Sequence, residues 1–104
     1  MRIPPFLLAL LSMALLSGSA ASAPADRGFT FAKTNCSGCH AIGKYDESPL
    51  KIAPPFRTLH ERYDIVDLEE AFAEGIVTGH PSMPQFQLDA AHIADLTAYL
   101  RTLE

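Results

Sequence analysis

The sequence contains few cysteines, fewer basic than acidic residues and no apolar run long enough to span a bilayer. Its two cysteines cannot form a framework of several disulfides. Eight Lys and Arg residues are outnumbered by twelve Asp and Glu residues, which argues against nucleic acid and anionic membranes as partners. The period-two alternation of a half-buried strand does not stand out, and no internal repeat follows the first 25 residues. The pattern that remains is one of helices joined by loops.

The start of the chain has the pattern of a secretory signal peptide. A basic residue is followed by an apolar run at 6–16 and then by small residues. The run is shorter than the ~20 apolar residues that a membrane-spanning helix needs, so an uncleaved anchor is the weaker alternative. We expect residues 1–22 to be the signal peptide, with cleavage between 20 and 25. The remaining domain, 25–104, would be periplasmic and would not stay inserted in the membrane.

The expected mature domain is small and acidic. Without Arg2 it has seven basic residues against twelve acidic ones, a formal charge of −5. A domain of this size buries a limited core and commonly relies on a cofactor or another staple. Its charge favours protein partners with a basic docking face.

The most informative stretch is Cys36-Ser37-Gly38-Cys39-His40. Two thiols separated by two residues and followed at once by an imidazole form the attachment signature of a c-type haem. Each thiol would add to one vinyl group of the porphyrin, and His40 would ligate the iron from below the ring.

Three other interpretations of the same residues are weaker. A thioredoxin-like redox motif expects a βαβ context, which the sequence lacks. A zinc site needs a fourth ligand, and no further cysteine is present. A plain disulfide between Cys36 and Cys39 remains compatible with export.

Met83 is the candidate for the second axial ligand. It is the only methionine outside the expected signal peptide, and it lies in a proline-bracketed loop at 79–86. A sole methionine in such a loop is better explained as an iron ligand than as a core residue. His80 is the alternative ligand, whereas His60 and His92 are expected on the surface. With both axial positions filled, electron transfer is favoured over oxygen or peroxide chemistry.

Apolar periodicity predicts four helices in the mature domain. The first is capped by Asp26, a short one starts at Pro54-Pro55, a third follows Asp64, and the last is capped by Asp89. The core positions of the last three are expected at Phe56, Leu59 and Tyr63, at Ile65, Leu68, Phe72 and Ile76, and at Ile93, Leu96, Leu100 and Leu103. Residues 44–53 are expected to form a surface loop.

Taken together, these motifs resemble a class I c-type cytochrome of the small soluble bacterial kind. The resemblance rests on the Cys36–His40 motif, Ala53-Pro-Pro-Phe56, the segment from Gly79 to Phe86, and Asp95-Leu-Thr-Ala-Tyr-Leu100. It implies an all-α fold in which short helices wrap around one covalently bound haem c. It also implies thioethers at Cys36 and Cys39, with His40 and Met83 as axial ligands.

The resemblance implies two further contacts and shows one departure. The carbonyl of Pro54 would accept a hydrogen bond from the ring of His40 and so fix its orientation. The first and last helices would cross, with Gly28 against Tyr99. Where many relatives have a phenylalanine four residues before the first cysteine, this chain has Ala32.

The function expected from this combination is that of a periplasmic, monomeric, non-enzymatic electron carrier. It would pass single electrons between redox proteins through a His/Met-ligated haem c. One alternative is a haem sensor or peroxidase-like enzyme in which Met83 dissociates. Another is a cytochrome subunit of a larger dehydrogenase or oxidase complex.

Overall fold

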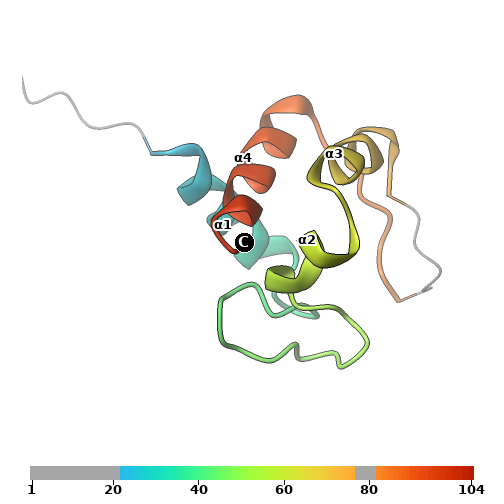
Figure 1. Ribbon diagram of the computed structural model, residues 1–104. Coiled ribbons are helices and arrows are strands. Elements are labelled where there is room, and N and C mark those ends of the chain that lie inside the picture. Colours follow the sequence, from blue (N-terminus) through green and yellow to red (C-terminus); the bar gives the residue numbers. More distant parts are fainter. Residues whose placement is uncertain (1–21, 77–81) are drawn as a thin grey trace, which may run out of the picture.

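The computed structural model describes residues 22–76 and 82–104, and the chain is all-α across them. Of the expected signal peptide only Ser22 falls within this part, and the alternative ligand His80 lies outside it. The helices are α1 (Pro24–Asn35), the 3₁₀ helix η2 (Phe56–Thr58), α2 (Leu59–Arg62), α3 (Ile65–Glu74) and α4 (Ala90–Arg101) (Figure 1). Across the described residues, no helix combines the length and the apolar character needed to cross a bilayer.

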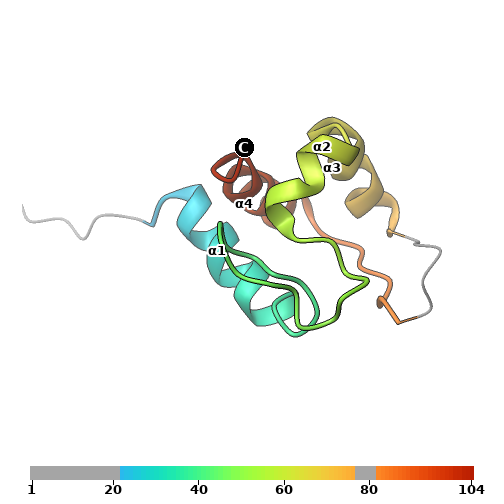
Figure 2. The ribbon, with the colours of Figure 1, turned by 60° about the horizontal axis from the view of Figure 1, so that its bottom comes forward.

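Helices α1 and α4 make the most extensive helix contact among the described residues, and Gly28 lets them cross closely (Figures 1 and 2). A Cβ added at Gly28 would lie 1.9 Å from the backbone oxygen of Asp95 and 2.8 Å from the Cβ of Tyr99. Only glycine lets the two backbones approach so closely. The expected meeting of Gly28 with Tyr99 is therefore confirmed.

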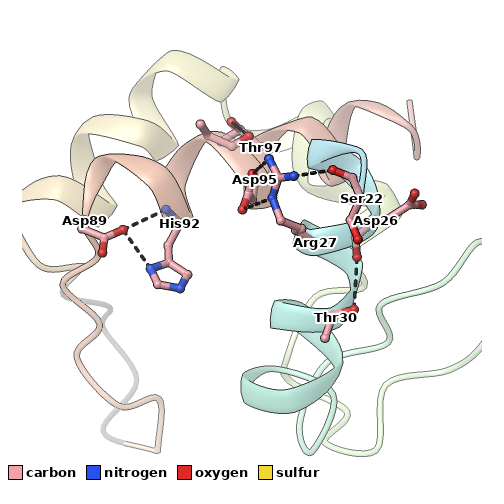
Figure 3. Close-up of polar contacts among 9 residues, drawn as sticks. Ser22, Asp26, Arg27, Thr30, Asp89, His92, Asp95 and Thr97 are labelled. Atoms are coloured by element: carbon pink, nitrogen blue, oxygen red, sulfur yellow. Dashed lines mark hydrogen bonds and ion pairs between the residues drawn. The ribbon is translucent and has the colours of Figure 1, made fainter. Parts of the chain in front are cut away.

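An ion pair links the same two helices beside the crossing. The guanidinium of Arg27 on α1 donates from Nε and Nη2 to the two carboxylate oxygens of Asp95 on α4, each at 3.0 Å (Figure 3). This two-pronged geometry is the one in which arginine recognises a carboxylate most specifically. Hydrogen bonding to Asp95 also raises the pKa of Arg27. The pair thus joins α1 to α4 beside the crossing.

The hydrophobic core lies between the α1–α4 pair and the helices α2 and α3. Its buried members are Ala32, Ile42, Phe56, Ile65, Leu68, Leu96, Tyr99 and Leu100, with Phe31, Cys36, Leu59, Phe72, Leu88 and Leu103 packed at its edge. Ala32 is completely buried, and the neighbouring Phe31 lies at the core edge with its ring centroid 5.1 Å from that of His92. At the position where many relatives have phenylalanine, the small side chain of Ala32 is thus buried, and the larger Phe31 lies beside it at the core edge.

Carboxylates cap two of the helices, and one of them is the predicted cap at Asp89. Asp64 accepts a hydrogen bond from the backbone N–H of Val66 at the start of α3. Asp89 accepts one from the backbone N–H of His92 at 2.8 Å at the start of α4, and this bond lowers the pKa of Asp89 (Figure 3). In each case the carboxylate satisfies an N–H group that the first turn leaves without a helical partner.

The cap predicted at Asp26 is wrong. Helix α1 begins two residues earlier at Pro24, with Ala23 in the capping position and no side-chain cap. Proline suits the first helical position because its missing N–H would have had no helical partner there. Asp26 instead lies in the first turn, where a negative charge is favourable to the helix dipole.

The core position predicted for Tyr63 is also wrong, because its side chain is 52% exposed. The prediction assumed one continuous helix after Pro54. The structure has a 3₁₀ turn at Phe56–Thr58 followed by the four-residue α2, which ends at Arg62. Tyr63 has extended backbone angles, so the helical periodicity that would have turned it inward stops before it.

Candidate haem site

The Cys36–His40 motif continues directly from the end of α1. The backbone N–H of Cys36 donates to Ala32 at 2.8 Å, and that of His40 donates to the carbonyl of Cys36 at 2.9 Å. These bonds keep the motif in helical turns, which places its two thiols about one turn apart. Both cysteines are free, with Cys36 half-buried and Cys39 exposed.

The two thiols differ in their surroundings. Cys36 packs against the edge of the core, and burial raises the pKa of its thiol to about 11. It is therefore protonated at neutral pH. Cys39 is at the surface. The sulfur of Cys36 thus lies against the apolar interior, whereas the sulfur of Cys39 lies at the surface of the same site.

The imidazole of His40 is fixed by the carbonyl of Pro54. Its Nδ1 lies 2.8 Å from that oxygen, which is the contact implied by the resemblance. Because a carbonyl oxygen only accepts hydrogen bonds, Nδ1 must carry the proton and donate it. In the neutral ring the lone pair is then on Nε2, the atom available to a metal. The ring of Phe56 lies beside the imidazole, with centroids 5.2 Å apart.

The loop after His40 is hydrogen-bonded to the residues directly before and after this histidine. On the N-terminal side, the carbonyl of Cys39 accepts from the backbone N–H of Leu50 at 3.1 Å. On the C-terminal side, the backbone N–H of Ala41 donates to the hydroxyl of Ser48 at 2.9 Å. Sequence reasoning missed Ser48 because a serine in a loop carries no motif that identifies its partner.

Ala41 and Ile42, which follow His40, are held by hydrogen bonds from two other parts of the chain. The carbonyl of Ala41 accepts from the backbone N–H of Phe56 at 2.9 Å. The phenol of Tyr99 on α4 donates to the carbonyl of Ile42. Tyr99 is 9% exposed. Its burial, and to a smaller extent the charge of Asp46, raises its pKa, so the phenol keeps its proton.

The candidate ligand Met83 lies on the segment that leads from α3 to α4. This segment is anchored where the backbone N–H of Ile76 donates to the carbonyl of Phe86 at 2.9 Å, and that of Leu88 donates to Phe72 at 2.9 Å. Met83 is half-buried three residues before this anchor. In both ribbon views the described residues 82–86 lie away from α1, on the other side of the described part of the molecule (Figures 1 and 2).

The other described histidines lie on the surface, as predicted. His60 lines two open hollows of about 410 and 540 Å³ between α2 and the last residues of the chain. His92 is exposed and pairs with Asp89 at 2.8 Å. Neither hollow is lined by the cysteines or by His40.

The donor set fits haem c. Two thiols at the required spacing lie next to an imidazole whose Nδ1 is hydrogen-bonded and whose Nε2 is available. Apolar residues from α2, α3 and α4 supply the surroundings that a porphyrin needs. Cys36, Cys39 and His40 are the residues that would hold it, and Met83 stays the predicted second ligand of the iron.

A helical domain with this motif has the features of a c-type haem protein, and the comparison with protein families specifies the class further. The family model for cytochrome c matches residues 25–104. The chain therefore belongs to the cytochrome c family, and its small size fits class I. Members of this family carry covalently attached haem c and take part in electron transfer. No curated protein and no solved structure matches the chain.

Proposed function

We propose that the protein is a periplasmic electron carrier whose haem c is ligated by His40 and Met83. The observation that carries this proposal is the 2.8 Å hydrogen bond from His40 Nδ1 to the carbonyl of Pro54. It leaves one defined nitrogen, Nε2, for the iron and makes the imidazole a more basic ligand. The periplasmic location rests on the signal-peptide pattern at 1–22.

The residues have separate tasks in this proposal. When bound, the haem supplies an iron that is reversibly oxidised and reduced by one electron. Cys36 and Cys39 would retain the group covalently, and His40 and Met83 would be the two protein ligands of its iron. With two protein ligands no place would be left for a substrate, which is why we propose a carrier and not an enzyme. The thioether of Met83 raises the potential because a soft ligand favours ferrous iron.

Met83→Ala tests the axial assignment. We expect the variant to lose the sulfur-to-iron charge-transfer band of the oxidised protein, to bind carbon monoxide when reduced and to have a lower potential. His80→Ala is the matched control and should keep all three wild-type properties. If Met83→Ala is unchanged and His80→Ala is altered, His80 is the ligand. Ready binding of carbon monoxide by the wild-type protein would favour the sensor or enzyme alternative.

The acidic surface leads to a second expected result. Exposed carboxylates lie along α3 at Asp67, Glu70 and Glu74, and the expected mature domain has a formal charge of −5. We propose that partners dock through a basic face. Electron transfer with a physiological partner should then slow as salt is added, because salt screens the attraction.

Stopped-flow mixing at increasing ionic strength measures this dependence. An uncharged small-molecule reductant serves as the control, since its reaction rate should stay nearly constant. A partner rate that is flat or rises with salt would contradict attraction to a basic face. The acidic face of α3 would then be ordinary solvated surface.

A further inference from the structure

The loop at 43–55 makes few hydrogen bonds to the rest of the described chain. Two of these bonds join it to the residues directly before and after His40. It contains no helix, and Lys44, Tyr45 and Ile52 are exposed. It leads to Pro54, whose carbonyl holds the imidazole. The loop is thus connected to the imidazole of His40 through this hydrogen bond.

Ser48 makes the only side-chain hydrogen bond to the peptide that follows His40 among the described residues. Its hydroxyl accepts from the backbone N–H of Ala41 at 2.9 Å. Ala41 is 1% exposed, so water has little access to this N–H group. A buried donor without a partner is costly, and the peptide would have to move to find another acceptor.

We propose that Ser48 is a positioning residue for His40. By holding the Ala41 peptide, its hydroxyl keeps the imidazole aligned with the carbonyl of Pro54. The same bond also fixes the loop six residues before that carbonyl. Both the donor and the acceptor of the His40–Pro54 hydrogen bond thus depend on Ser48. This inference rests on the proposed function only in taking His40 as an iron ligand.

The expected consequence is a change in how strongly His40 donates electron density. A hydrogen bond from Nδ1 makes the opposite nitrogen more basic, which stabilises oxidised iron. If Ser48 is lost, the bond to Pro54 weakens and the oxidised form is less stabilised. The potential should therefore rise, opposite to the change expected for Met83→Ala.

Ser48→Ala in the haem-loaded protein tests the proposal by NMR and by redox titration. The Nδ1 proton of His40 should exchange with solvent roughly three- to tenfold faster than in the wild type, the range expected when one hydrogen bond loses its net stabilisation. The potential should rise in the same sample. Ser48→Thr keeps the hydroxyl and should restore both values.

Thr34→Ala is the matched control. Its hydroxyl lies outside the Cys36–His40 motif and donates to the carbonyl of Thr30 within α1 at 2.9 Å, so its removal should leave the exchange rate and the potential unchanged. If Ser48→Ala alters neither quantity, or lowers only the unfolding midpoint, or if Ser48→Thr fails to restore them, the positioning role is overturned.

Failure of the axial assignment would be seen separately. The ring protons of His40 in the oxidised wild-type protein should show the large shifts of an iron ligand. Their absence would overturn the proposed ligation without any reference to Ser48. The comparison of Ser48→Ala with the wild type then decides the positioning role alone.

Discussion

Gly28→Ala should destabilise the folded protein by about 3 kcal/mol, the upper end of the usual cost of overpacking. The new Cβ would lie 1.9 Å from the backbone oxygen of Asp95, closer than any non-bonded contact allows. A backbone oxygen cannot rotate away as the end of a side chain can, so α1 and α4 would have to separate. In a helix without this close contact, Gly→Ala stabilises the helix by about 1 kcal/mol. A loss of stability in Gly28→Ala would therefore show that the helix crossing, and not helix propensity, decides the effect.

Denaturant unfolding of the haem-loaded variant measures this effect. Gly38→Ala is the matched control, because a Cβ at Gly38 would meet nothing within 4 Å. Its unfolding midpoint should stay near that of the wild type. If Gly28→Ala unfolds at the wild-type midpoint, α1 and α4 do not approach as closely as the structure shows.

The helix crossing also bears on the site. Tyr99 packs against Gly28 on one side and donates its phenol proton to Ile42 on the other. Ile42 is two residues after His40. Separation of α1 from α4 would therefore loosen the segment that carries the proposed iron ligand. We expect Gly28→Ala to change the haem environment as well as the stability.

The features that could be predicted from the sequence are those whose chemistry is local. The cap at Asp89 and the start of a helix after Asp64 depend on residues within the next three positions. The Cys36–His40 motif is likewise contained in five residues. The contact between Gly28 and Tyr99 joins distant residues, and the resemblance to a known family predicts it.

The features that could not be predicted depend on how separate segments come together. Arg27 and Asp95 are 68 positions apart, and nothing in either helix alone identifies the pair. Ser48 reaches the N–H of Ala41 across an irregular loop, where no periodicity specifies which side chain turns inward. Tyr63 was misplaced because apolar spacing does not show where a short helix ends.

Replacing both Cys36 and Cys39 with serine should abolish covalent retention of haem. Serine has no sulfur, so it cannot form the thioether that each cysteine would supply. The chain without its haem should then be largely unfolded, since a domain this small has a limited core of its own. Denaturing gel electrophoresis with haem staining measures retention, and circular dichroism measures the remaining helix.

The two single variants separate attachment from packing. Cys39 is exposed, so Cys39→Ser should remove one thioether with little direct effect on the core. Cys36 is half-buried at the core edge, so Cys36→Ser also places a hydroxyl in apolar surroundings and should be the less stable of the two. Undiminished haem staining in the double variant would overturn the assignment of both cysteines. Equal stability of the single variants would instead show that the half-buried position of Cys36 contributes little beyond its thioether.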